Sequence, residues 1–101
     1  MGECVNFGII DTVERNCGER RYVSVKVSLN NRLFPVVIER QTAKWEMFND
    51  RSVRIMRGGC EVVKNTVRVL LPTHCPGTYD LKFTFRVPPE TIIAGVRVRV
   101  R

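Results

Sequence analysis

The sequence predicts an all-β protein, an antiparallel immunoglobulin-like β-sandwich of about seven to eight strands. Hydrophobic and polar residues alternate strictly over two C-terminal segments, residues 79–87 and 96–101. Such a period of two is typical of strands that bury one face and expose the other. Upstream, turn residues separate short apolar segments about every 8–12 residues, as in small sandwiches. The alternative is a small oligonucleotide-binding-type barrel, for which the expected number of strands is slightly high.

The two C-terminal segments are expected to be neighbouring strands. Residues 88–90, Pro-Pro-Glu, join them through a proline-containing loop. One face carries Tyr79, Leu81, Phe83, Phe85 and Val87 from the first segment and Val96, Val98 and Val100 from the second. A second layer must cover this apolar face, and we expect residues 1–101 to form one domain.

Upstream segments are expected to supply that layer. Residues 4–13 contain a short apolar stretch and predict a first strand, and residues 22–29 alternate cleanly. Asn30-Asn31 favours a tight hairpin, because both residues tolerate a positive φ. Residues 33–39 are expected to return as a strand. Pro35 places that strand at a sheet edge, since proline cannot donate a hydrogen bond to the ladder.

The middle of the chain shows a different pattern. Residues 40–50 lack a period of two and favour a helical turn or an ordered loop between the sheets. Residues 52–56 and 60–63 are expected to form one hairpin across Gly58-Gly59, and a turn at Lys64-Asn65 leads into a strand over residues 66–71. Residues 72–77 would then connect this meander to the C-terminal pair.

The charge of the chain is strongly positive. It has 17 Lys and Arg against 10 Asp and Glu, a net charge of +7. Such a surface attracts polyanions, which include nucleic acid, anionic lipid headgroups and acidic proteins. Net charge also keeps small proteins soluble, so basicity by itself favours a polyanion partner only modestly.

The arginines and lysines at polar strand positions are the candidate binding residues. If they share a sheet, they form a cationic patch that follows a phosphate backbone. The alternative is a solvated face whose charges prevent aggregation. The candidate residues are Lys26, Arg54, Arg68, Lys82, Arg86, Arg97, Arg99 and Arg101.

The four cysteines, Cys4, Cys17, Cys60 and Cys75, are the first candidates for chemistry. They form no C-x-x-C pair, and the closely spaced ligand pairs of a zinc site are absent, so we expect no metal and no cofactor. Disulfides Cys4–Cys17 and Cys60–Cys75 are plausible in a secreted protein, and free thiols in a cytosolic one. With three possible pairings, the sequence does not choose among them.

Catalysis is not expected. The chain has one histidine, His74, in a proline-flanked loop, and its acidic residues show no paired spacing. No phosphate loop or nucleophile elbow is present. The start of the chain has no signal-peptide pattern and no segment is long enough to span a bilayer, so we expect a soluble protein, with an intracellular location slightly favoured.

Two stretches resemble known families. Residues 75–88, Cys-Pro-Gly-Thr-Tyr-Asp-Leu-Lys-Phe-Thr-Phe-Arg-Val-Pro, resemble the late strand of the ML lipid-recognition domain family, and residues 3–17 resemble its N-terminal cysteine pair. Residues 79–87 are also similar to a strand of Rho guanine-nucleotide dissociation inhibitors. Both families are immunoglobulin-like sandwiches, and the first consists of secreted domains that hold lipid between their sheets. The resemblance therefore implies the sandwich architecture and a possible lipid carrier.

Three functions follow, in this order. The first is a non-catalytic binding module that uses its basic sheet face on a polyanion, with nucleic acid the leading partner. The second is a lipid carrier with a cavity between the sheets. The third is a structural or assembly protein, viral or accessory, that pairs through exposed strand edges at residues 33–39 or 96–100.

Overall fold

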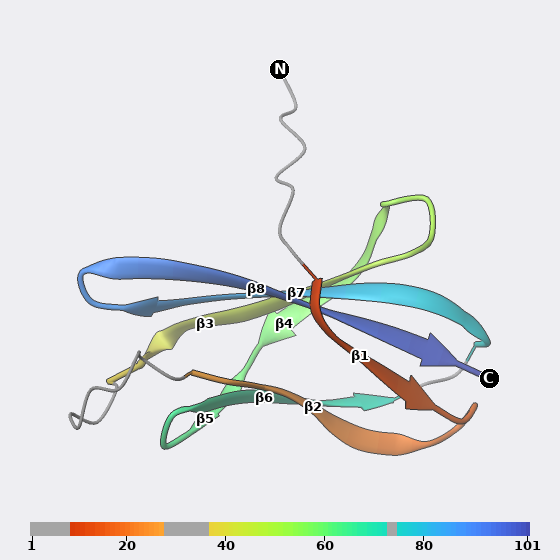
Figure 1. Ribbon diagram of the computed structural model, residues 1–101, viewed down its shortest axis with the longest axis horizontal. Helices are drawn as coiled ribbons and strands as arrows, with labels where there is room; N and C mark the ends of the chain where they lie inside the picture. Colours follow the sequence, from red (N-terminus) through yellow and green to blue (C-terminus); the bar gives the residue numbers. More distant parts are fainter. Residues whose placement is uncertain (1–8, 28–36, 73–74) are drawn as a thin grey trace.

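The computed structural model describes residues 9–27, 37–72 and 75–101, which form eight strands in two layers (Figure 1). The predicted β-sandwich of seven to eight strands is thus confirmed. The two sheets stay separate and no barrel closes among the described strands, so the alternative of an oligonucleotide-binding-type barrel is wrong. The strands are β1 (Ile9–Arg15), β2 (Arg20–Lys26), β3 (Glu39–Phe48), β4 (Arg54–Gly59), β5 (Glu61–Val63), β6 (Thr66–Pro72), β7 (Gly77–Val87) and β8 (Glu90–Val100).

The five-stranded sheet has the order β1-β8-β7-β3-β4. Its centre is the antiparallel hairpin of β7 and β8, which pair along their whole length, from Gly77 opposite Val100 to Val87 opposite Glu90. The prediction that these two strands are neighbours is confirmed. β1 is added to β8 in parallel, and β3 and β4 follow β7 in antiparallel order.

Because β8 is flanked by β1 and β7, it has no free edge. The expectation that residues 96–100 form an exposed edge for self-association is therefore wrong. β1 and β4 form the two edges of this sheet instead. The other proposed edge, residues 33–39, lies mostly outside the described residues.

The three-stranded sheet has the order β2-β6-β5 and packs against the larger sheet. β2 pairs with β6 over seven positions, from Arg20 opposite Pro72 to Lys26 opposite Thr66. The hairpin expected at Asn30-Asn31 lies outside the described residues, so β2 is described only with its partner β6. The turn expected at Lys64-Asn65 is confirmed: it joins β5 to β6, with a φ of 54° at Lys64.

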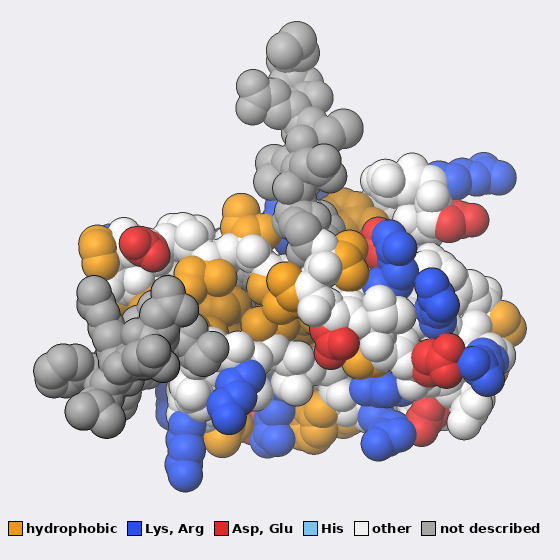
Figure 2. All heavy atoms as spheres, viewed as in Figure 1, with side chains coloured by type: hydrophobic (Ala, Val, Ile, Leu, Met, Phe, Trp, Pro, Cys, Tyr) orange, Lys and Arg blue, Asp and Glu red, His pale blue; other side chains and the backbone are white. Residues whose placement is uncertain are grey.

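The core lies between the two sheets. Leu81, Phe83 and Phe85 of β7 are at most 1% exposed, and Val23 and Val67 of the smaller sheet are as deeply buried. Each such side chain contributes about 1.5–3 kcal/mol to folding when fully buried. In Figure 2, hydrophobic side chains lie in the band between the layers, and many of the visible Lys and Arg side chains lie along the lower edge and the right-hand end.

Residues 40–50 correct the sequence prediction. They were expected to be a helical turn or loop, but β3 covers Glu39–Phe48 and lies between β7 and β4. Ala43, Trp45 and Met47 are buried while Lys44 is exposed, so the strand does alternate. The alternation is hidden because its first apolar member is a small alanine and the register shifts between Glu39 and Lys44.

The expected hairpin between residues 52–56 and 60–63 is also wrong. β4 pairs with β3 in the larger sheet, whereas β5 pairs with β6 in the smaller one. The chain therefore changes sheets at Cys60, whose amide donates a hydrogen bond to the Ala43 carbonyl at 3.1 Å. Gly58 and Gly59 lie at the end of β4 and do not form a tight turn. Glycine is needed at residue 58 for packing, because a Cβ there would lie 2.9 Å from Nε1 of Trp45.

This packing yields a stability prediction. We expect Gly58→Ala to lower the free energy of unfolding by about 1–3 kcal/mol, because the buried Trp45 ring must shift to admit a methyl group. Gly59→Ala is the matched control. Its Cβ would have the Ala43 carbonyl oxygen, 4.0 Å away, as its nearest neighbour, so this variant should be neutral or more stable by up to about 1 kcal/mol. Urea unfolding of both variants tests the point, and equal stabilities would contradict it.

Candidate functional site

The outer face of the five-stranded sheet gathers basic side chains. Because alternate residues of β7, β8 and β3 are buried in the core, the residues between them point away from it. Seven of these outward positions on the three central strands and on β4 carry cations, beside uncharged residues such as Thr78, Thr84 and Ile93. We call this set the basic face: Lys44, Arg54, Arg57, Lys82, Arg86, Arg97 and Arg99.

One carboxylate on this face, Asp80, is held tightly by Arg97. The two residues lie directly opposite each other on β7 and β8. Nε of Arg97 donates to Oδ1 of Asp80 at 2.9 Å, and Nη2 donates to Oδ2 at 3.4 Å. This fork-shaped contact raises the pKa of Arg97, mainly through the hydrogen bond from its guanidinium to Asp80, so the arginine stays charged.

The second carboxylate, Glu46, is shared between two cations. Oε2 of Glu46 lies 3.2 Å from Nη1 of Arg54, and Oε1 lies 3.6 Å from Nζ of Lys82. The partners come from strands on both sides of β3, because β4 carries Arg54 and β7 carries Lys82. Each oxygen of this carboxylate thus faces a different cation.

The other four cations of the basic face are exposed and have no such partner. Within the described residues, the side chains of Lys44, Arg57, Arg86 and Arg99 make no hydrogen bond or ion pair. None of the four charges is neutralised by an ion pair, although Glu39 lies opposite Arg86 and Glu14 lies opposite Arg99 in the strand ladders.

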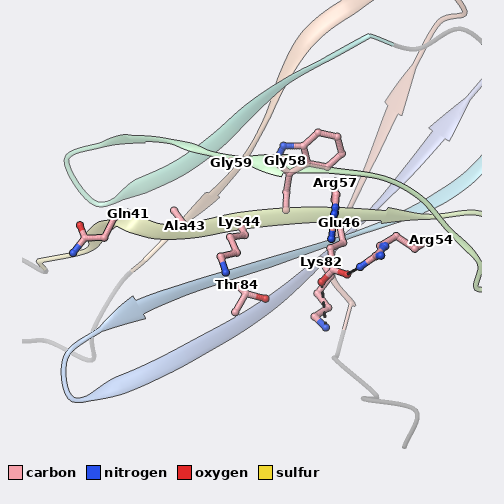
Figure 3. Close-up of a pocket in the computed structure, with 11 residues that line it drawn as sticks. Gln41, Ala43, Lys44, Glu46, Arg54, Arg57, Gly58, Gly59, Lys82 and Thr84 are labelled. Atoms are coloured by element: carbon pink, nitrogen blue, oxygen red, sulfur yellow. Dashed lines mark hydrogen bonds and ion pairs between the residues drawn. The ribbon is translucent and has the colours of Figure 1, made fainter. Parts of the chain in front are cut away.

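A groove opens where β3, β4 and β7 meet on this face. Its volume is about 790 Å³. It is lined by Gln41, Ala43, Lys44, Trp45, Glu46, Arg54, Arg57, Gly58, Gly59, Lys82 and Thr84. Gly59 lies opposite Lys44 in the ladder and carries no side chain, which leaves the groove open beside the lysine. Figure 3 shows Lys44, Lys82 and Thr84 on the same side of β3, with Glu46 between Arg54 and Lys82.

The structure brings together five of the residues that the sequence predicted as polyanion-binding: Arg54, Lys82, Arg86, Arg97 and Arg99. The remaining three, Lys26, Arg68 and Arg101, lie elsewhere. The condition for a cationic patch, that several of these residues share a sheet, is therefore met on the larger sheet by these five.

Lys26 and Arg68 belong to the smaller sheet, and their strand positions point away from the core on the opposite side of the molecule. Arg68 forms an ion pair of 3.0 Å with Glu61 and lowers the pKa of that carboxyl group, chiefly through a hydrogen bond. The Arg68 guanidinium also stacks 4.2 Å above the ring of Tyr22. Arg101 follows the end of β8 and forms an ion pair of 2.8 Å with Glu14 of β1.

Sequence reasoning missed Lys44 and Arg57. Lys44 was overlooked because residues 40–50 were not recognised as a strand, although the alternation of Ala43, Trp45 and Met47 is a signal that would have found it. Arg57 is not among the predicted residues because the strand expected there ends at residue 56, whereas β4 extends to Gly59. No local signal in the sequence shows that β4 pairs with β3.

The cysteines occupy separate places. Cys60 and Cys75 are free thiols, so the Cys60–Cys75 disulfide is not present in the structure, while Cys17 is exposed and Cys4 lies outside the described residues. Burial raises the pKa of the Cys60 thiol to about 12. In the described part of the chain, no group of three or more His, Cys, Asp or Glu side chains is placed to hold a metal ion. The same residues contain no helix long and apolar enough to cross a membrane.

Comparison with known proteins supports the fold. No protein-family model matches this chain, and no curated protein sequence matches it. Among solved structures, it is similar to the crystal structure of CopC from Methylosinus trichosporium OB3b, with a TM-score of 0.63 and 12% sequence identity. The match covers 92% of this chain and 84% of that chain. At this level of identity the similarity concerns the architecture alone.

The burial of Cys60 gives a reactivity prediction. At pH 8 we expect iodoacetamide to modify Cys75 rapidly and Cys60 at least about tenfold more slowly, because the thiolate is the reacting form and burial suppresses it. Peptide mapping by mass spectrometry follows each site, and alkylation in denaturant serves as the control in which the two rates converge. Equal rates in the native protein would contradict the prediction.

Proposed function

We propose that this protein is a non-catalytic binding module that holds a polyanion, with nucleic acid as the leading candidate, on the outer face of its five-stranded sheet. One observation carries the proposal. The basic face presents seven cations. Its carboxylates are Asp80 and Glu46, which form ion pairs on it, and Glu39 and Glu14, which lie opposite Arg86 and Arg99 in the strand ladders; four of the cations make no ion pair within the described residues.

The physical basis is charge neutralisation. A polyanion that contacts Lys and Arg side chains releases condensed counterions, and this release drives binding. Arginine suits phosphate because its planar guanidinium donates two parallel hydrogen bonds. The four unpartnered cations lie one on each of four adjacent strands, β4, β3, β7 and β8, so they span most of the width of the sheet.

The face favours recognition of the backbone over recognition of bases. Single-strand binding with base stacking needs exposed aromatic rings. Within the described residues, Phe48 is the only aromatic side chain at an outward position of this sheet, and it is half-buried. Tyr22 belongs to the smaller sheet and Trp45 is buried. Binding is therefore expected to depend on phosphate charge and little on sequence.

The groove also distinguishes this proposal from a lipid carrier. A carrier of the ML type holds its ligand between the sheets, whereas five of the eleven residues that line the groove described above are charged and belong to one sheet, with Ala43 and Trp45 as its apolar side chains. Between the sheets, Phe83, Phe85 and Leu71 are at most 1% exposed and pack within the core.

A paired-variant experiment tests the proposal. We expect wild-type protein to bind duplex DNA or RNA with a slope of about −3 to −4 when log K is plotted against log salt, as about four phosphate contacts require. Replacing Lys44 and Arg57 together by alanine should weaken binding at least about tenfold and reduce the magnitude of the slope by about two. Fluorescence anisotropy at several KCl concentrations provides both quantities.

The control removes the same charge from the other side of the molecule. Arg20 and Lys26 are exposed at outward positions of β2, and their double alanine variant should keep most of the affinity. Failure of the wild-type protein to bind nucleic acid at low salt would overturn nucleic acid as the partner. Equal losses in the two double variants would overturn the assignment of binding to the basic face.

A further inference from the structure

Glu46 occupies the centre of the groove and is surrounded by cations. Arg57 lies directly opposite it on β4 and Lys82 directly opposite it on β7. Lys44 precedes it by two residues on the same face of β3, and Arg54 contacts it from β4. One carboxylate thus lies among four positive charges that come from three strands.

The contacts of Glu46 resemble those of a bound oxyanion. Its two oxygens engage Arg54 at 3.2 Å and Lys82 at 3.6 Å, and its side chain is 26% exposed, so it is held at the groove surface and not buried below it. Lys44 and Arg57 are left without a partner in the described part of the groove. The arrangement can accept an oxyanion with more charge and more acceptor oxygens than a carboxylate provides.

The charge of a phosphate group decides how tightly it binds at this position in place of Glu46. An internal phosphodiester carries one negative charge, so exchanging the Glu46 carboxylate for it leaves the charge among the four cations unchanged. A terminal phosphate carries about −1.5 to −2 near pH 7 and has three strong acceptor oxygens. Its additional charge and third oxygen are available to Lys44 and Arg57, the two cations that Glu46 does not contact.

We propose that the centre of the groove is a subsite for the terminal phosphate of a nucleic-acid strand, and that this phosphate binds by displacing Glu46 from Arg54 and Lys82. The inference rests on the proposed function and names the part of the polyanion that the groove recognises. The released Glu46 side chain turns to solvent. The phosphodiesters that follow lie across β7 and β8, where Arg97 and Arg99 point outward.

Oligonucleotides of one sequence test this inference, with a 5′-phosphate, a 3′-phosphate or hydroxyl groups at both ends. At pH 8 and low salt, we expect wild-type protein to bind a phosphorylated strand about tenfold more tightly than the unphosphorylated one. In Glu46→Gln, the affinities for phosphorylated and unphosphorylated strands should both rise. The ratio of the two affinities should fall to about two, because an internal phosphodiester then also binds the cations that Glu46 no longer neutralises. Anisotropy titrations of the three oligonucleotides with the two proteins measure the six constants.

Asp80→Asn is the matched control. It removes one carboxylate that is paired with an arginine on the same face, but outside the residues that line the groove. It should raise both affinities by a similar factor and leave the ratio of about ten unchanged. A wild-type ratio near one, or a ratio that Glu46→Gln does not alter, would overturn the inference while leaving the proposed function in place.

Pyrophosphate separates this inference from the proposed function. Saturable shifts of the Lys44 and Glu46 backbone amide signals in NMR spectra would support the subsite. If pyrophosphate produced these shifts but no oligonucleotide bound, nucleic acid would be overturned as the source of the phosphate, and the subsite itself would stand. Absence of these shifts would overturn the subsite, even where duplex DNA still bound through the rest of the basic face.

Discussion

The pairing of β7 with β8 is the constraint on which the rest of the structure depends. The two strands are 11 residues each and are matched from end to end, so their register is set by a single hairpin. A strand has a side-chain period of two, and shifting the register by one residue would move every buried side chain to the solvent face. Burying Leu81, Phe83 and Phe85 therefore fixes the outward direction of Lys82 and Arg86. The core and the basic face are two consequences of the same alternation.

The groove depends on how the chain leaves the larger sheet. β4 ends in Gly58 and Gly59, after which Cys60 carries the chain across to the smaller sheet. Gly58 admits the Trp45 ring on the inner side, and Gly59 leaves space beside Lys44 on the outer side. Two adjacent glycines thus serve the core and the surface at once, because adjacent residues of a strand point to opposite faces.

The parts of the fold that can be predicted from the sequence are those whose partners are local. The alternation of β7 and β8 is complete and the segments are joined by a short loop, so both their structure and their pairing follow from the sequence. β3 has a weaker signal, because its buried positions begin with Ala43 after a shift of register. Its stability as a strand comes from pairing with β7 and β4 on both sides, and sequence propensity does not contain that information.

The same limit applies to the basic face. Arg97 and Arg99 can be predicted because they alternate with buried valines on a strand that the sequence identifies. Arg57 cannot, since its place beside Glu46 depends on a pairing between β3 and β4 that no local motif encodes. Lys26 and Arg68 show the converse. The alternating pattern correctly places both residues at solvent-facing positions of their strands. It does not show which of the two sheets a strand joins, and both residues lie on the other side of the sandwich.

The two ion-paired carboxylates of the basic face, Asp80 and Glu46, differ in a way that bears on the proposed binding of anions. Seven cations on one face repel each other, and neutralising some of them favours the folded state. Asp80 lies directly opposite Arg97 and receives two hydrogen bonds from its guanidinium, which is a fixed structural contact. Glu46 divides its oxygens between two cations at 3.2 and 3.6 Å, a looser arrangement in which neither partner is held by a fork. Under the proposed function, an external phosphate therefore replaces Glu46 at lower cost than Asp80, and this difference favours the groove over the Asp80–Arg97 pair as the place where the phosphate binds.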